Sequence, residues 1–171
     1  MDNKQIAIRK IALTSLFSAT AIGLGYALAP IPNVELITAT LFLSGYILSW
    51  KYGIYSAVIT YLVFSIFNPF GFSHPLLLTS QVIGGIAAVI AGNISRKYKN
   101  LIIFILSGFL ITLFYDVITN IAGYLVFVSE QTLIVYIAGG IVFCLIHIIS
   151  NIFIFGLILF PLQRLFEKLA I

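Results

Sequence analysis

The nine basic residues of this chain are distributed so that all of them can lie on one side of a membrane. They precede the first long apolar segment and follow the second, the fourth and the last: Lys4, Arg9, Lys10, Lys51, Arg96, Lys97, Lys99, Arg164 and Lys168. The other breaks between apolar segments, at residues 30–34, 68–75 and 129–132, contain no lysine or arginine. Positive charge beside a membrane span holds that end in the cytoplasm. The pattern therefore predicts six transmembrane helices with short loops and both termini in the cytoplasm.

The composition points to the same class of protein. The chain has 171 residues, of which 61% are hydrophobic and 8% are charged, whereas soluble domains carry about 25% charged residues. A span needs about 20 residues, so six spans use nearly the whole length and leave no room for a soluble catalytic domain. We expect an all-α, single-domain, multi-pass protein of the lipid bilayer, with spans at about residues 6–29, 34–50, 52–67, 76–94, 101–128 and 133–160 and an amphipathic tail at 162–171. Pro161 is expected to end the last span.

Several function classes are excluded at this stage. The net charge of +4 is accounted for by topology and by attraction to anionic lipid, so we expect no nucleic-acid partner. The sequence has no P-loop and no zinc-protease motif, and Cys144 is its one cysteine. Two histidines, one cysteine and one intramembrane aspartate provide few candidates for catalytic acids, bases or nucleophiles. We therefore expect neither an enzyme nor a bound metal or cofactor.

The first apolar segment carries a row of small residues. Ser15, Ala19, Gly23 and Ala27 are each four positions apart, and residues at that spacing share one face of a helix. Small side chains allow another membrane helix to approach closely. The row predicts either packing against the protein's own spans or a docking face for another membrane subunit.

Polar residues lie deep inside the last two apolar segments. Asp116 is followed one turn later by Asn120, and His147 is followed at the same spacing by Asn151. An ionisable group at membrane depth is costly, so it usually has a partner or a functional task. Either Asp116 contacts a ligand, or Asp116 and His147, or the two asparagines, bond to each other in a buried polar network that fixes helix packing.

A third group of residues gathers at the end of the molecule that we assign to the outside. A pocket for a flat, polar molecule needs aromatic walls and a few placed donors and acceptors, and the outer breaks and adjoining spans contain both. The alternative is an ordinary aromatic belt at the membrane interface. The candidate ligand contacts are Asn33, Glu35, Asn68, Phe70, Gln81, Tyr115, Asp116, Asn120 and Tyr124.

The chain resembles the substrate-binding S components of energy-coupling factor (ECF) transporters over essentially its whole length. The resemblance lies in the topology, in the basic N-terminus with its small residues, and in six short segments. These are RKIALTSLFSA at residues 9–19, PNVEL at 32–36, LSGY at 43–46, NPFG at 68–71, YDVITN at 115–120 and HIISN at 147–151.

The resemblance implies a high-affinity binding subunit for a vitamin or related micronutrient in a prokaryotic cell membrane. Members take their ligand from the outer face and associate with a transmembrane T component and two cytoplasmic ATPases. The family's small-residue docking motif corresponds here to Ser15, Ala19 and Gly23. Nickel and cobalt members have an N-terminal histidine segment that Met1-Asp2-Asn3 lacks, so a metal substrate is not expected.

The charges at the predicted outer end limit the classes of ligand that could bind there. That end has no basic residue and offers Glu35, Glu130 and the nearby Asp116, which disfavours a strongly anionic ligand. A neutral or weakly cationic heterocycle fits better. Two other interpretations stay open: a structural multi-span subunit of an envelope or cell-shape complex that binds no solute, and an autonomous small transporter or channel.

Overall fold

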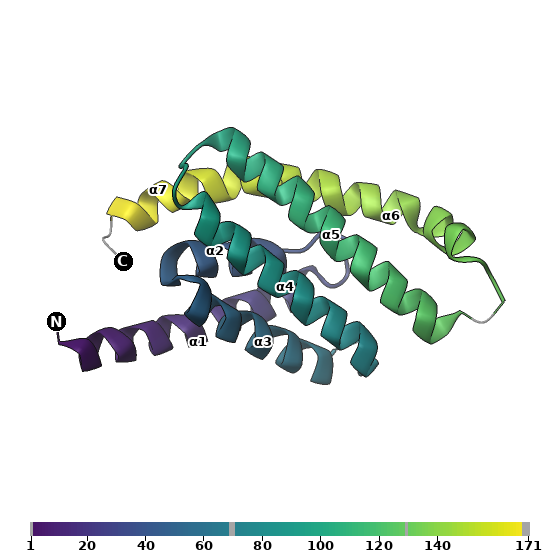
Figure 1. The fold of residues 1–171 in the computed structure, drawn as a ribbon, viewed down its shortest axis with the longest axis horizontal. Helices are drawn as coiled ribbons and strands as arrows, with labels where there is room; N and C mark the ends of the chain where they lie inside the picture. The colour runs from purple at the N-terminus through teal and green to yellow at the C-terminus, as the bar shows by residue number, and fades with distance from the viewer. Residues whose placement is uncertain (1, 69–70, 129, 169–171) are drawn as a thin grey trace.

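The computed structural model describes residues 2–68, 71–128 and 130–168, and this part of the chain is helical with no strand. Figure 1 shows long helices lying roughly alongside one another, with the N- and C-terminal ends and the turn between α4 and α5 at the same end of the molecule. The elements are α1 (Asn3–Leu28), α2 (Ile37–Leu48), α3 (Trp50–Ile66), α4 (Pro75–Ser95), α5 (Leu101–Phe127), α6 (Leu133–Phe153), the π-helix η1 (Ile154–Leu159) and α7 (Phe160–Lys168).

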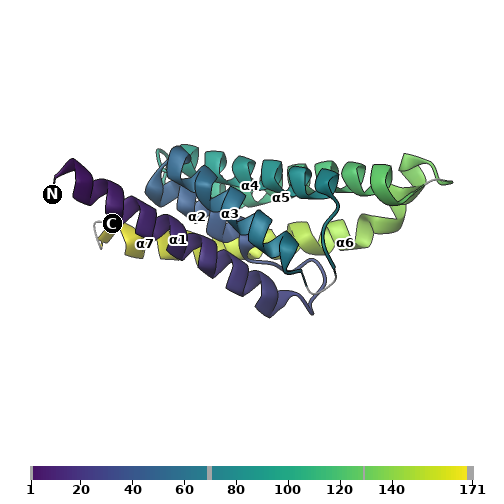
Figure 2. The same ribbon diagram turned by 90° about the horizontal axis from the view of Figure 1, so that it is seen from below.

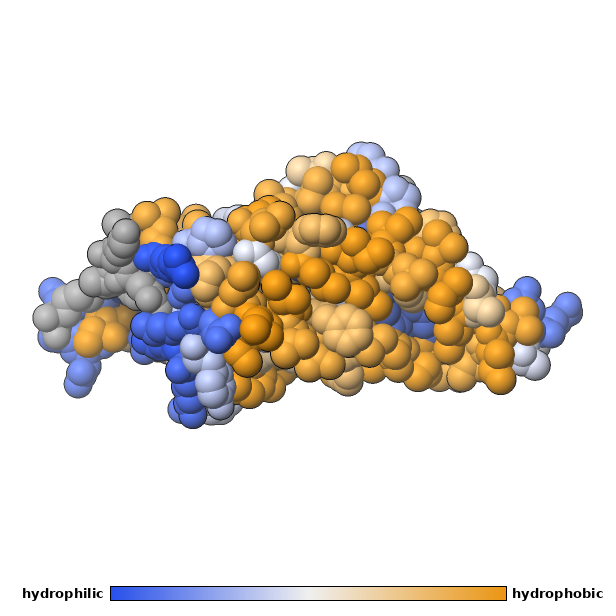
Figure 3. Space-filling view, turned by 90° about the horizontal axis from the view of Figure 1, so that it is seen from above, coloured by the Kyte–Doolittle hydropathy of each residue, from blue (hydrophilic) through white to orange (hydrophobic). Residues whose placement is uncertain are grey.

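The described helices divide into long apolar ones and shorter ones. Four helical segments are long and apolar enough to cross a membrane, namely α1, α4, α5 and the continuous stretch Leu133–Phe166. The surface agrees, because Figure 3 shows apolar side chains over most of the visible face and polar side chains toward the two ends. A surface of this kind is stable in lipid and not in water. The molecule is an all-helical, multi-pass membrane protein.

The short helix α2 forms the centre of the bundle. All of its 12 residues except Ile47 are buried, and it packs against α1, α3 and α4. At 1.5 Å per residue it is about 18 Å long, less than the roughly 30 Å of a bilayer's hydrocarbon core. The neighbouring helices enclose α2, so its backbone is shielded from lipid although the helix is too short to cross the bilayer.

Glycines allow α2 and α4 to approach closely. A Cβ atom on Gly45 would overlap the backbone of Val89, and one on Gly92 would overlap the carbonyl of Phe42. Both glycines are buried. Membrane helices associate through such close van der Waals packing, since lipid supplies no hydrophobic force between them. This contact fixes the position of α2, from whose N-terminal end the site is built.

The last helix does not end at Pro161, in contrast to the expectation from the sequence. The segment Leu133–Phe166 runs on as one helix through η1 and α7. Proline removes an i→i−4 hydrogen bond, and the π-helical turn directly before it widens the backbone at that point. Within the tail, Gln163 is buried and accepts a 2.6 Å hydrogen bond from the hydroxyl of Tyr46. The tail therefore docks onto α2, and the apolar Leu165 is exposed.

Helix α1 lies along the side of the bundle (Figure 2). Its inward face consists of Thr14, Ser18, Ala21 and Gly25, all buried. The Ser18 hydroxyl donates to the hydroxyl of Ser56 on α3 over 3.2 Å. The four-spaced row of small residues thus belongs to a different face of α1 from the one that packs on the bundle.

Candidate functional site

A cavity of about 590 Å³ opens between the loop before α2 and the helices around it. Its volume lies in the range of pockets that hold vitamin-sized molecules. Its walls come from the end of α1, the loop at residues 29–36, and α3, α4, α5 and α6. The polar and aromatic residues that line it are Asn33, Glu35, Tyr61, Phe64, Asn68, Gln81, Tyr115, Asp116, Thr119, Asn120, Phe143, Cys144 and His147.

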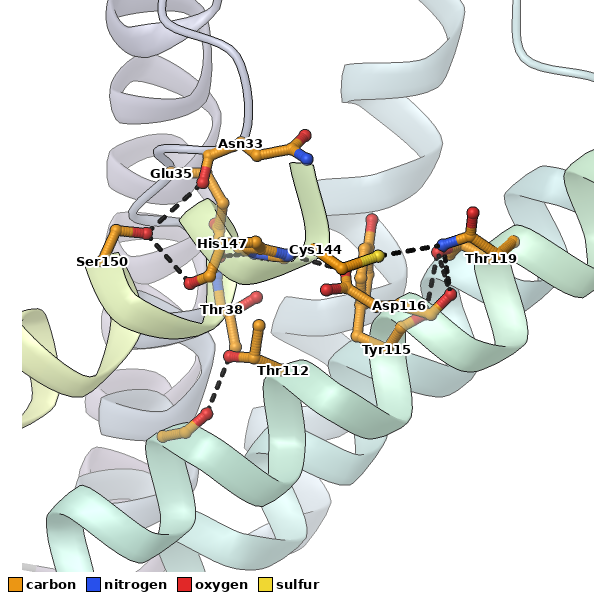
Figure 4. Close-up of polar contacts among 12 residues, drawn as sticks. Asn33, Glu35, Thr38, Thr112, Tyr115, Asp116, Thr119, Cys144, His147 and Ser150 are labelled. Carbon is orange, nitrogen blue, oxygen red and sulfur yellow. Dashed lines mark hydrogen bonds and ion pairs between the residues drawn. The ribbon is translucent and has the colours of Figure 1, made fainter. Parts of the chain in front are cut away.

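Three ionisable side chains from three elements meet at the base of this cavity (Figure 4). Nδ1 of His147 on α6 lies 2.6 Å from Oδ1 of Asp116 on α5, and Nε2 of the same ring lies 3.4 Å from Oε1 of Glu35. A carboxylate can only accept, so the imidazole donates to Asp116. The other oxygen of Glu35 accepts a 2.8 Å hydrogen bond from the backbone N–H of Thr38 at the start of α2.

These contacts explain why each group sits where it does. The N-terminal end of a helix favours a negative charge, and Glu35 occupies that position on α2. Asp116 and His147 are both buried, with 8% and 5% of their surface exposed. A buried carboxylate is tolerated when it is paired. One oxygen of Asp116, Oδ2, is buried and receives no hydrogen bond from the described residues.

Aromatic rings form one side of the cavity. Tyr61 on α3 stacks on Tyr115 on α5 with ring centroids 6.2 Å apart, and the rings of Tyr115 and His147 lie nearly perpendicular with centroids 5.9 Å apart. Tyr115 fits close to α4 because a Cβ on Gly84 would overlap its ring. Phe64 and Phe143 add further apolar surface. A flat ligand would find both stacking surface and polar contacts here.

An aromatic cluster lies among α2, α5, η1 and α7, away from the loops that bound the cavity. The Phe42 ring packs edge-on against Phe104 at 5.3 Å and against Phe155 at 4.9 Å, and Phe104 also meets Phe160 at 5.5 Å. Phe42, Phe104 and Phe155 are fully buried. This cluster fills the space among these four elements with buried rings.

The structure brings most of the candidate ligand contacts together. Seven of them line the cavity, namely Asn33, Glu35, Asn68, Gln81, Tyr115, Asp116 and Asn120. Phe70 lies outside the described residues. Tyr124 is not on the cavity, because it is one further turn along α5, where its hydroxyl donates to the backbone carbonyl of Gln131 and its ring contacts Tyr136.

The polar residues Asp116, Asn120, His147 and Asn151 combine the two expected roles, ligand contact and helix packing. Asp116 both bonds to His147 and lines the cavity, so the packing role and the cavity position coincide. Asn120 donates to the backbone carbonyl of Asp116 over 2.7 Å and does not bond to Asn151. Asn151 is fully buried one turn from His147, and its side chain has no hydrogen bond to the described residues. The network therefore includes Glu35 in place of Asn151.

Sequence reasoning missed four prominent lining residues. Phe143 and Cys144 precede His147 by four and three positions, so helical spacing from that histidine would have found them. Tyr61 and Phe64 lie in a largely apolar stretch of α3 with no charged neighbour to mark them. Among the residues that the structure describes, no group of histidine, cysteine, aspartate and glutamate is placed to hold a metal ion.

The row of small residues on α1 faces away from the bundle. Ser15, Ala19, Gly23 and Ala27 are all exposed, and a Cβ on Gly23 would meet nothing within 4 Å. Packing against the described helices is therefore not the role of this row. The second small-residue face, with Ala21 and Gly25, performs that packing.

A comparison with protein-family models identifies the class of protein. The model of the ECF transporter substrate-specific component matches residues 9–159. The chain belongs to this family. Neither a search of curated proteins nor a search of solved structures gave a match. Members of the family bind a small-molecule substrate for uptake and work with T and ATPase components. S components are the substrate-binding subunits of these transporters and are not enzymes.

Proposed function

We propose that this S component captures a vitamin or related micronutrient at the outer face of a prokaryotic cell membrane and delivers it to a T component and two ATPases. In this proposal the chain spans the membrane six times with both termini in the cytoplasm. The loop before α2 and the loop between α3 and α4 then face outward. Lys51, Arg96 and Lys97 lie at the opposite end, with the termini.

The observation that carries the proposal is the cavity itself. It is large enough for a vitamin-sized molecule, it has aromatic walls, and seven residues expected from the sequence line it. Its polar groups lie beneath the loop that precedes α2, where the predicted topology places the outside. A structural subunit without a solute would gain nothing from an open space lined by the carboxylates of Glu35 and Asp116, because charged groups held at this depth are costly.

The proposed ligand is a neutral or weakly cationic heterocycle. Asn33, Asn68, Gln81 and Asn120 bring side-chain amides to the cavity wall, and an amide both donates and accepts hydrogen bonds. Heterocycles carry donors and acceptors on one flat edge. Tyr115, which is half-buried and stacked against the buried Tyr61, supplies aromatic surface for such a ring.

The proposed docking surface for the T component is the exposed row Ser15, Ala19 and Gly23. In lipid, a flat strip of small side chains brings two helix backbones close and gains dispersion energy. The row runs along α1 on the side away from the bundle, so docking there leaves the cavity unobstructed.

Mass spectrometry of small molecules that co-purify with the protein tests the proposal. One heterocyclic compound at close to one molecule per chain is expected from the wild type. Asp116→Asn should retain clearly less of it, whereas Asp2→Asn, which removes an exposed charge at the far end of α1, should retain the wild-type amount. A wild-type preparation without any stoichiometric compound, from cells grown in rich medium, would favour a subunit that binds no solute.

A further inference from the structure

The cavity carries an unbalanced negative charge. Glu35, Asp116 and His147 are the lining residues that can carry a full charge at neutral pH, and no lysine or arginine is among the lining residues that the structure describes. With a neutral imidazole the three side chains carry a charge of −2, and with an imidazolium they carry −1. With Glu35 and Asp116 ionised, the cavity is negative in both protonation states of His147.

Such an imbalance is costly at this depth. Charges interact more strongly in a protein interior than in water, and a buried pair is stable only when both partners are matched. Here one histidine is shared between two carboxylates, at 2.6 Å and 3.4 Å. An imidazolium balances one of the two, so one negative charge has no counterpart among the lining side chains.

The hydrogen bonds show the same deficit. The His147 ring has two nitrogens, and both are directed at carboxylate oxygens. Asp116 Oδ2 is buried and accepts nothing from the described residues. Thr119 and Asn120 turn their polar groups to backbone carbonyls on α5 and not to the Asp116 carboxylate. The Asp116 carboxylate therefore has acceptor capacity that no described donor fills.

Building on the proposed function, we infer that the ligand of this cavity is a cation: a flat nitrogen compound that carries its positive charge on N–H donors and has no carboxylate or phosphate group. The donors bind the carboxylates of Asp116 and Glu35, and the flat body lies against Tyr115. The charge supplies the missing counterpart, and the N–H groups supply the missing donors. Cations are also attracted to the faces of tyrosine rings.

The single cysteine of the chain allows the charge of the cavity to be measured without knowing the ligand. Cys144 is half-buried and lines the cavity. Its rates of modification by two methanethiosulfonate reagents of similar size are compared in the purified full-length chain in nanodiscs. One reagent carries a trimethylammonium group and the other a sulfonate group. Both react with the same thiolate, so the ratio of the rates reports the local potential and not the ionisation of the thiol.

The cationic reagent should react faster by about ten-fold or more after correction for the rates with a free thiol, because a negative cleft concentrates cations. Asp116→Asn and Glu35→Gln should each bring the ratio toward one. Asp2→Asn changes the net charge equally but at an exposed position far from the cavity, and it should leave the ratio unchanged. A wild-type ratio near or below one, or no reaction with either reagent, would overturn the inference.

A second measurement uses only the wild type, so it does not depend on whether the variants fold. Benzamidine, benzamide and benzoate are flat and similar in shape and carry charges of +1, 0 and −1. Each is tested for protection of Cys144 against an uncharged methanethiosulfonate. Benzamidine should protect at a concentration at least about ten-fold lower than benzamide, and benzoate should not protect. Equal protection by all three, or the best protection by benzoate, would contradict a cationic ligand.

These results separate the inference from the proposed function. A neutral or anionic compound found by mass spectrometry would refute the cationic ligand and leave the uptake role intact. A negative cavity that yields no compound from any preparation would refute the uptake role, while the measured potential would still stand.

Discussion

Nδ1 of His147 lies 2.6 Å from Oδ1 of Asp116, although the two residues are 31 positions apart in the sequence. The contact joins α5 to α6 at a depth where neither helix has another charged group. Helix α6 packs mainly against α5 and η1. The pair therefore couples the geometry of the candidate site to the position of α6, which also bears the lining residues Gly140, Phe143 and Cys144.

Removal of His147 should destabilise the fold strongly. His147→Ala leaves the carboxylates of Asp116 and Glu35 facing each other without the imidazole, and breaking a buried pair costs about 3 kcal/mol or more. The midpoint of thermal unfolding in detergent should fall. Asp116→Asn should recover part of that loss in the double variant, because it removes one of the two unpaired charges. Strictly additive effects would show that the two side chains are not coupled.

The close contact of α2 and α4 gives a prediction with an internal control. Gly92→Ala places a methyl group against the carbonyl of Phe42, which is backbone and cannot turn aside. Overpacking of this kind costs about 1–3 kcal/mol, so the unfolding temperature should drop. Gly23→Ala adds the same methyl group where nothing lies within 4 Å and should leave stability unchanged or slightly improved. Equal effects of the two variants would contradict the described packing.

Ala19→Leu should separate docking from ligand binding. Ala19 is exposed on α1 and does not line the cavity, so the purified variant should keep its ligand. A leucine there would hold another helix away from the α1 backbone, and co-purification of tagged T component should fall by about ten-fold or more. Ala138→Leu makes the same change on an exposed position of α6 and serves as the control. A loss of folding in Ala19→Leu would mean that this face packs internally after all.

The aromatic cluster should contribute much of the stability of the bundle. Phe155 is fully buried against Phe42, whereas Phe153 on the same helix is 59% exposed. Phe155→Ala should destabilise the protein by about 3–5 kcal/mol, and Phe153→Ala should have little effect in a lipid nanodisc. Unfolding of both variants followed by circular dichroism measures the difference. Similar midpoints would place the core of the bundle elsewhere.

The class of fold and much of the candidate site could be predicted from the sequence, because placing a charged or polar group in lipid is energetically costly and such groups are therefore rare and conspicuous in apolar segments. A charged side chain in an apolar segment is expensive, so Asp116 and His147 stood out at once and were found in contact. The loop residues Asn33 and Glu35 stood out as polar groups between two apolar segments, and both line the cavity.

Other features depend on packing that leaves a weaker mark on a sequence. The aromatic wall at Tyr61 and Phe64 looks like any other part of an apolar helix until α3 is placed beside α5. The last helix continues past Pro161 through the π-helical turn before it. No residue pattern in the sequence predicts such a turn. Tyr124 was expected at the cavity because helical spacing places it on the same face of α5 as Asn120. It lies one turn further along the helix, beyond the cavity wall.

The account is tested most directly by transport into proteoliposomes that contain the chain, its T component and the two ATPases. The compound eluted from the purified chain is supplied outside in labelled form, and ATP is supplied on the side of the ATPases. We predict accumulation of label that requires ATP, that is lost with Asp116→Asn through weaker binding, and that is lost with Ala19→Leu although binding persists. Accumulation by the chain alone, or tight binding that never leads to accumulation in the complete assembly, would contradict the account.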